Sequence, residues 1–168
     1  MNVANIKDYV TLFFDESLTV FNSTLFTWSI PASYYSNQRS RVCSVSIVDA
    51  TITTDTLFKS ILIDYINGGF NSYSTAKRRN VIGQMSIVET SGGLSTYVIS
   101  HVSEPIRLLT NARPDKIQIK LLKTDNTEIR DTDIYFIGAG GCITLAFTYY
   151  DAEETDKQLH NQYTNVLR

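Results

Sequence analysis

The sequence predicts an all-β fold built as a sandwich or barrel, and two features support that prediction. The first is residue usage: the 168 residues include ten Tyr and eight Phe, together with many Thr, Ile and Val, the types that favour pleated, half-buried strands. The second is alternation. Ile117, Ile119 and Leu121 share one face of a segment whose other face is Lys and Gln, which is typical of a half-exposed strand. No segment shows the apolar spacing of a helix over three turns.

Eight segments show strand character, and turn residues separate several of them. Gly92 and Gly93 lie between two β-rich segments, which predicts a hairpin. Pro31, Pro105 and Pro114 fall at strand ends, where a missing N–H removes no ladder bond. The expected strands are residues 24–30, 42–53, 60–66, 80–90, 94–102, 105–110, 115–122 and 142–150. That number and spacing indicate one sandwich or barrel domain.

We expect this domain to span residues 23–150, with an N-terminal arm at 1–22 and a C-terminal tail at 151–168. Tyr9–Phe14 is either a peripheral strand or part of the extended arm. Residues 151–168 are polar and lack an apolar stripe, which is typical of a trailing end. The first residues lack the charged-then-apolar order of a signal peptide, so secretion by that route is not expected. No apolar segment is long enough for a transmembrane helix.

The charge balance argues against a nucleic-acid partner. Fifteen basic and seventeen acidic residues give a net charge of −2, whereas proteins that bind nucleic acid usually carry a basic excess. Lys77, Arg78 and Arg79 form the only basic cluster in sequence. It is a candidate contact for nucleic acid or an acidic partner, and the alternative is three charges in a solvated loop.

The sequence contains no recognisable catalytic or metal-binding arrangement, so we predict neither an enzyme nor a cofactor. His101 ends a predicted strand three residues before Glu104, and a pairing between them is less expected than an ordinary solvent-edge histidine. The oxygen-rich segments 125–128 and 131–133 lack the spacing of a calcium loop, and turn chemistry explains them more simply. Cys43 and Cys142 form a disulfide only if their strands adjoin, and two buried reduced thiols are the alternative.

The second half of the chain resembles a known family of capsid proteins. The residues that carry the resemblance run from Glu104 through Pro105, Asn111 and Pro114 to Leu122, then through the turn at 125–126, the segment 134–137 and the strand 143–149. Together with residues 79–83 and the hairpin that follows them, they resemble the later strands of single jelly-roll penton and minor capsid proteins. Those proteins belong to large DNA viruses, virophages and their relatives. The resemblance covers residues 24–150 and concerns strand order and style rather than invariant motifs.

This resemblance implies an eight-stranded antiparallel jelly-roll sandwich of two Greek-key sheets. It also implies a structural protein of the virion, assembled in the host cell as a homopentamer at the icosahedral fivefold vertex or as a minor capsid protein. The implied partners are copies of the chain, the major capsid protein and other minor capsid proteins. Tyr34, Tyr35, Phe70 and Tyr73 lie in predicted loops and suit subunit contacts. The alternative is that they cap the ends of the sandwich.

A ligand- or carbohydrate-binding module on the same kind of sandwich is the second interpretation. Such a module needs aromatic and amide side chains that converge on one sheet face or rim. Trp28 is the single indole, and it lies within the apolar face of a predicted strand, which favours a place in the core over a sugar-binding platform.

Overall fold

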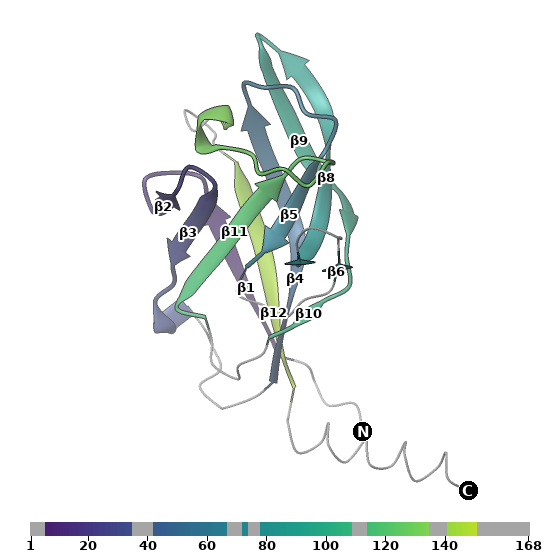
Figure 1. Ribbon diagram of the computed structural model, residues 1–168. Coiled ribbons are helices and arrows are strands. Elements are labelled where there is room, and N and C mark those ends of the chain that lie inside the picture. Colours follow the sequence, from purple (N-terminus) through teal and green to yellow (C-terminus); the bar gives the residue numbers. More distant parts are fainter. Residues whose placement is uncertain are drawn as a thin grey trace, which may run out of the picture.

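The computed structural model describes residues 6–34, 42–66, 72–73, 78–108, 114–134 and 141–150. Within these ranges the chain forms strands that pair antiparallel throughout (Figure 1). The strands are β1 (Ile6–Phe13), β2 (Leu18–Phe21), β3 (Leu25–Ser29), β4 (Val42–Thr54), β5 (Ile61–Tyr65), β6 (Ser72–Tyr73), β7 (Arg78–Arg79), β8 (Val81–Ser91), β9 (Leu94–Val102), β10 (Ile106–Arg107), β11 (Lys116–Leu122) and β12 (Cys142–Tyr150). Two short 3₁₀ helices, η1 (Ala32–Tyr34) and η2 (Asp131–Asp133), complete the described elements.

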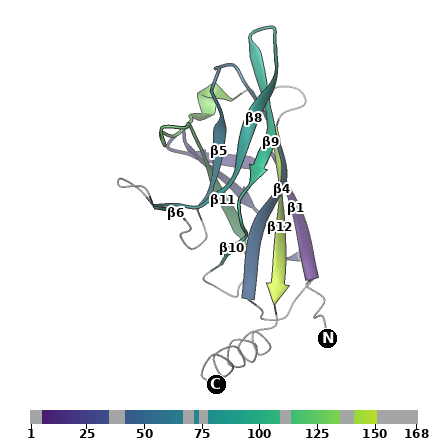
Figure 2. The same ribbon diagram turned by 90° about the vertical axis from the view of Figure 1, so that its right-hand side faces the viewer.

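The strands follow the spatial order of a jelly roll. One sheet has the order β1-β12-β4-β9 and the other β8-β5-β11-β3, and the β8–β9 hairpin joins them along one side. These eight strands can be renumbered 1 to 8 in chain order, leaving out the short β2, β6, β7 and β10. The two sheets then have the orders 1-8-3-6 and 5-4-7-2, which is the arrangement that two Greek keys produce. Figure 2 shows β1, β12 and β4 in one layer and β5 and β11 in the other. The predicted eight-stranded jelly-roll sandwich is confirmed.

The N-terminal segment belongs to this sandwich, which corrects the expected boundary. β1 pairs along its whole length with β12, and β2 extends the opposite sheet beyond β3. Residues 6–21 are therefore not an arm. Val10, Leu12 and Phe14 alternate into the core, and that burial is what holds β1 in place. Residues 109 and 110 of the expected strand at 105–110 lie outside the described residues, and its described part contains the short β10, which pairs beside β4.

The core consists of the inward residues of both sheets. Alternate positions face inward because successive side chains of a strand point to opposite faces. Phe14 marks the side where β1 meets β3, and its ring lies edge-on to Phe26 at 5.5 Å and to Trp28 at 5.3 Å between ring centroids. The other large buried side chains include Ile47, Ile52, Ile61, Ile63, Tyr65, Met85, Tyr97, Ile117, Ile119, Leu121, Ile143, Leu145 and Phe147.

Gly141 permits the close approach of the chain just before β12. A Cβ atom at this position would lie 2.5 Å from the carbonyl oxygen of Thr51 and 2.9 Å from Cα of Ile52. Its own carbonyl oxygen accepts a hydrogen bond of 2.9 Å from the backbone N–H of Phe14. The absence of a side chain at Gly141 therefore allows β12 to begin close to the backbone of β4 and beside β1.

Cys43 and Cys142 lie in neighbouring strands but at opposite ends of their pairing. Cys142 is opposite Thr51 of β4, whereas Cys43 is opposite Tyr149 of β12. At roughly 3.3 Å of rise per residue the two positions are about 26 Å apart along the strands, far beyond the reach of a disulfide. Cys142 is a free thiol. Burial, and then the nearby charge of Asp49, raise its pKa above the ordinary value.

Phe13 and Phe14 provide a matched test of the corrected boundary. We expect Phe14→Ala to lower the free energy of unfolding by about 3–5 kcal/mol, because it removes a buried ring from the cluster with Phe26 and Trp28. Phe13→Ala changes the exposed neighbour, and we expect a loss of about 1 kcal/mol or less. Urea unfolding followed by circular dichroism measures both. Equal effects would contradict the placement of β1 in the sandwich.

Candidate functional site

Among the described strands, no pairing closes the side of the sandwich opposite the β8–β9 hairpin. Here β1 ends one sheet, while β3 and then β2 end the other. The indole Nε1 of Trp28 donates a hydrogen bond of 2.8 Å to the carbonyl oxygen of Phe13, which joins the two sheets at one point of this seam. Beside that bond lies a groove of about 510 Å³, lined by residues 9–13 of β1 and residues 28–31, together with Ser17.

The seam exposes one backbone edge of β1. Because the N–H of Phe14 bonds to the carbonyl oxygen of Gly141, the even-numbered residues of β1 bond to β12. By alternation, Lys7, Tyr9, Thr11 and Phe13 direct their N–H and C=O groups toward the seam. The Trp28 bond to the Phe13 carbonyl agrees with this assignment. No strand of the described residues pairs with this edge.

Tyr9 and Phe13, two exposed aromatic residues, line this groove, whereas Phe21 lies opposite Leu25 of β3 and does not line it. Tyr9 is 61% exposed, Phe13 53% and Phe21 49%, and all three lie on β1 or β2. Among the residues whose side chains are described, every other large exposed hydrophobic residue is aliphatic. Aromatic residues are enriched at the cores of protein interfaces, so the seam is the strongest candidate contact surface in the described part of the chain.

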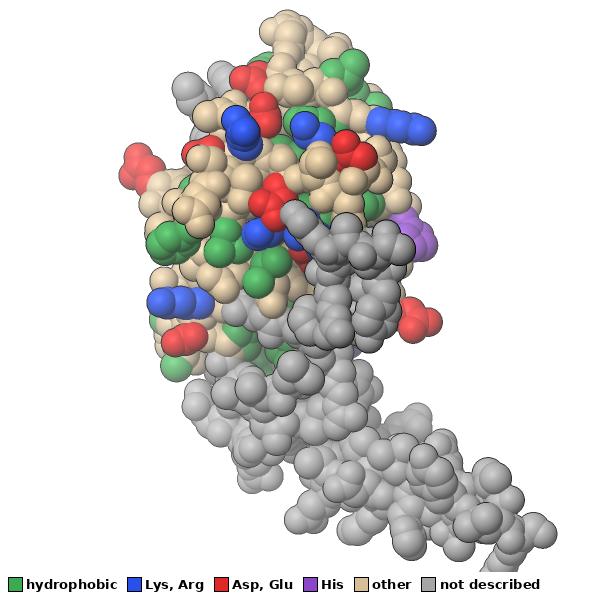
Figure 3. Space-filling view, in the orientation of Figure 1, with side chains coloured by type: hydrophobic (Ala, Val, Ile, Leu, Met, Phe, Trp, Pro, Cys, Tyr) green, Lys and Arg blue, Asp and Glu red, His purple; other side chains and the backbone are tan. Residues whose placement is uncertain are grey.

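Few charges lie on the sheet that β1 borders. Its four main strands contain three charged residues, Lys7, Asp8 and Asp49, of which Asp8 is buried, and the short β10 beside β4 adds Arg107. The outward positions are mainly small and uncharged, among them Thr11, Ser46, Thr51, Thr144 and Ala146. Charged side chains are instead interspersed over the face that Figure 3 shows. The two outer faces of the sandwich therefore differ in chemistry.

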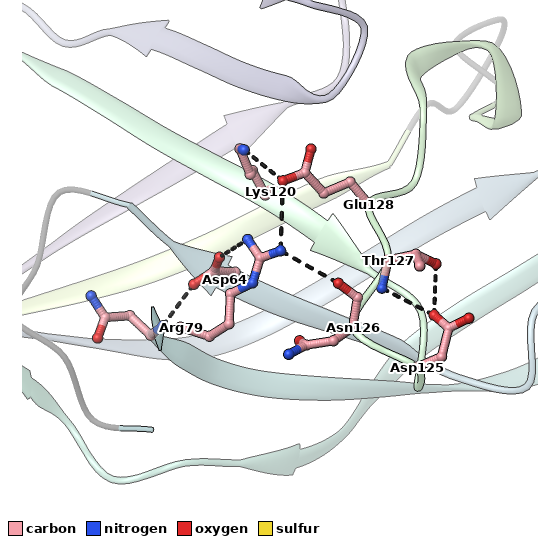
Figure 4. A network of polar contacts seen from close by, with 8 residues as sticks. Asp64, Arg79, Lys120, Asp125, Asn126, Thr127 and Glu128 are labelled. Carbon is pink, nitrogen blue, oxygen red and sulfur yellow. Dashed lines mark hydrogen bonds and ion pairs between the residues drawn. The ribbon is translucent and has the colours of Figure 1, made fainter. Parts of the chain in front are cut away.

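A network of ion pairs and hydrogen bonds lies on the outer face of the other sheet (Figure 4). Asp64 of β5 pairs with Arg79 through a contact of 3.1 Å, and its second carboxylate oxygen accepts a 2.7 Å hydrogen bond from the N–H of Asn80. The Arg79 guanidinium also lies 3.6 Å from Glu128, which Lys120 contacts at 2.6 Å. The network thus connects β5, β7, β11 and the turn after β11.

Glu128 remains ionised to a lower pH than an ordinary glutamate. Burial would raise its pKa, but hydrogen bonds from Lys120 and Thr24 and the positive charges of Lys120 and Arg79 together lower it below 4.5. A depressed pKa means that the folded state favours the carboxylate form. The network therefore contributes to stability at neutral pH, and this contribution is lost as the pH falls through the pKa of the folded state.

Arg79 differs from the sequence-based expectation. It was expected beside Lys77 and Arg78 as an external basic contact, but it is 6% exposed and its guanidinium is occupied by Asp64. Arg78 lies opposite Tyr73 in the β6–β7 pair, so two of the predicted contact residues adjoin along the backbone. Tyr34 ends η1 after β3. Tyr35, Phe70 and Lys77 lie outside the described residues.

The acidic turn after β11 is explained by its own hydrogen bonds. The Asp125 carboxylate accepts hydrogen bonds from the hydroxyl of Thr127 at 2.6 Å and from its N–H at 3.0 Å. These bonds lower the pKa of Asp125, and Asn126 takes the left-handed conformation of a turn. Within the described ranges, no group of three His, Cys, Asp or Glu side chains is placed to hold a metal ion. Those ranges also contain no helix that is long and apolar enough to cross a membrane.

Comparison with known proteins adds no assignment: the chain matches neither a protein-family model nor a curated protein.

Removing Arg79 tests the polar network. We expect Arg79→Met to lower the free energy of unfolding by about 3–5 kcal/mol, because it leaves the Asp64 carboxylate buried without its cation. Adding Asp64→Asn, which keeps an acceptor for the Asn80 N–H, should recover part of that loss. Lys116→Met, an exposed change on the same sheet, should alter stability by no more than about 0.5 kcal/mol. Chemical denaturation measures all three, and an unaffected Arg79→Met variant would show that the pair contributes nothing.

The acid sensitivity of the network is a separate prediction. Because the pKa of Glu128 is lowered in the folded protein, the melting temperature of the wild type should fall as the pH decreases from neutrality to below 4.5. At neutral pH the Glu128→Gln variant should melt at a lower temperature than the wild type. Over the same pH interval its melting temperature should fall by less than that of the wild type. Glu89→Gln, an exposed change on the β8–β9 hairpin, should retain the wild-type pH dependence. Thermal melts across this range are the measurement, and parallel curves for wild type and Glu128→Gln would contradict the prediction.

Proposed function

We propose that the chain is a structural subunit of a virus capsid, which assembles with copies of itself as a fivefold-vertex (penton) protein or acts as a minor capsid protein. The observation that carries the proposal is the complete jelly-roll strand order combined with exposed aromatic residues along one open side. The resemblance of residues 24–150 to single jelly-roll penton and minor capsid proteins supplies the functional class. The major capsid protein and other minor capsid proteins are the partners that this role requires, and the virion is its location.

The chemistry of the surface supports a role in assembly. A closed ring of identical subunits needs two complementary patches on each subunit. Contact surfaces of that kind are depleted of charge at their centres and enriched in aromatic residues. The sheet bordered by β1 combines these properties, with Tyr9 and Phe13 at its edge and small uncharged residues across β12 and β4.

The groove at the seam favours a second candidate, a ligand-binding module. A volume of about 510 Å³ lies within the range of small-molecule sites. A carbohydrate platform is less well supported, because Trp28 is 3% exposed and its Nε1 already bonds to Phe13. A glycan or metabolite array read by direct binding distinguishes this candidate from an assembly subunit.

The mass of the purified protein tests the proposed role. Light scattering coupled to size exclusion should give five times the 19.0 kDa of the chain if it forms a vertex ring by itself. A trimer would favour the ligand-binding module. A monomer at every concentration would contradict the self-assembling ring, and binding to purified major capsid protein would then decide whether a minor capsid role remains.

A further inference from the structure

We propose that a second pocket, separate from the groove at the seam, binds a phosphate group, either free or as a monoester. This pocket has a volume of about 310 Å³ and is lined by residues 56–60 and 123–125. It lies between the β4–β5 connection and the turn after β11, at the end of the sandwich where the β8–β9 hairpin projects (Figure 1). We call it the lysine pocket, after Lys59 and Lys123. The inference does not depend on the proposed capsid role, because no described residue lines both this pocket and the groove.

Hydrogen bonds from the sandwich fix one wall of the lysine pocket. The Tyr97 hydroxyl of β9 accepts a 2.6 Å hydrogen bond from the N–H of Phe58 and donates one of 2.8 Å to the carbonyl oxygen of the same residue. The Thr54 hydroxyl, at the end of β4, donates a 2.6 Å bond to the carbonyl oxygen of Thr56. Tyr97 and Thr54 are both buried. Because buried side chains of the sheet hold this part of the backbone, the wall is in place before a ligand arrives, which lowers the ordering cost of binding.

Two lysines bring positive charge to the pocket. Lys59 and Lys123 both line it. The ammonium group of Lys123 lies 5.7 Å from the centre of the Phe58 ring, a cation–π contact that favours its place on this wall. In the part of the chain that the structure describes, neither lysine forms an ion pair. Two cations without a counter-charge beside one concavity favour an anion, and lysine is a common ligand of phosphate.

Ser60 adds a buried hydrogen-bond donor to the same lining. Its exposed fraction is 5%, and its hydroxyl has no hydrogen-bond partner among the described residues. Buried polar groups of native proteins are nearly always hydrogen-bonded, so a buried hydroxyl without a protein partner indicates a position where a ligand or solvent completes the bond. Thr124 contributes a second hydroxyl from the turn after β11. Ammonium groups and hydroxyls all donate, which matches the acceptor oxygens of phosphate.

The acidic residues nearby are engaged with other groups. Asp125 is the only acid among the described lining residues, and its carboxylate accepts hydrogen bonds from the hydroxyl and the N–H of Thr127. Asp55 and Asp133 are not part of the lining, and the Thr56 hydroxyl contacts the carboxylates of both at 3.2 Å. These three acids oppose an anion, so we expect a modest affinity that depends on both lysines.

Charge and size favour phosphate over other anions. A phosphate monoester carries a charge of about −1.5 to −2 at neutral pH, whereas a carboxylate carries a single charge. Because Coulomb attraction scales with the product of the charges, two lysines gain more from phosphate than from a carboxylate. The volume of about 310 Å³ lies at the lower end of the range for small-molecule sites. It therefore suits the phosphate group itself and little of the molecule that carries it.

Titration with inorganic phosphate, followed by the amide chemical shifts of isotopically labelled protein, tests the site. At neutral pH and constant ionic strength, shifts at residues 56–60 and 123–125 should saturate with a dissociation constant on the order of 1 mM. Acetate should bind about fivefold more weakly or less, and equal binding of acetate would overturn the assignment to phosphate. Adenosine monophosphate should bind about as tightly as phosphate, and if it does not bind, the ligand is free phosphate alone.

Substitutions in the pocket show whether these side chains bind the anion. Lys59→Gln and Lys123→Gln should each weaken phosphate binding by about fivefold, and the double variant should show no saturable shift. Ser60→Ala should weaken binding by about two- to fivefold, because it removes one donor. Asp125→Asn should strengthen it, because it removes an opposing charge and keeps an acceptor for Thr127.

Lys116→Gln, a change of an exposed lysine on the other sheet, is the matched control and should bind phosphate like the wild type. Circular dichroism checks that each variant is folded. Shifts that never saturate in the wild type, or that saturate equally in the double lysine variant, would overturn the site. Neither result bears on the mass of the assembled protein, so the proposed function is tested separately.

Discussion

The aromatic contact between β1 and β3 holds together the side of the sandwich that no strand pairing closes. The β8–β9 hairpin joins the two sheets covalently and by hydrogen bonds on one side. On the other side, Phe14 packs against Phe26 and Trp28, and the Trp28 indole bonds to the Phe13 carbonyl. Because Phe14 lies just beyond β1, the same contact positions the strand that ends this sheet in the described part of the chain.

The buried ion pair on the outer face of the second sheet has a different role. Two charges removed from water contribute little net stability even when they are well paired, while loss of one partner is costly. Asp64 and Arg79 are fifteen residues apart, so their pairing fixes where the chain between β5 and β8 returns to the sheet. Glu128 and Lys120 add the turn after β11 to the same connection. We interpret the network as a determinant of loop placement more than of total stability, and double-mutant cycles at Asp64 and Arg79 would test that interpretation.

The strands were predictable where the sequence alternates clearly. Ile117, Ile119 and Leu121 of β11 and Ile143, Leu145 and Phe147 of β12 are buried as their two-residue spacing predicts. β1 shows the same spacing at Val10, Leu12 and Phe14, but the sequence left residues 9–14 open between a peripheral strand and part of an extended arm. Arg79 was not separable from Lys77 and Arg78 by sequence, because its partner Asp64 comes from another strand. The open edge was also not predictable, since it depends on which strand ends the sheet.

The sequence by itself determined which residues face inward, because alternation along a strand is a local property of the backbone. It also determined the overall class of fold, the turns at Gly92 and Gly93, and the burial of Trp28. Only the tertiary structure decided which strands are neighbours, where Cys43 lies relative to Cys142, and which strands end each sheet in the described part of the chain. These are relations between segments far apart in the chain. They depend on how two sheets bury a shared core, and no local pattern of residues encodes that choice.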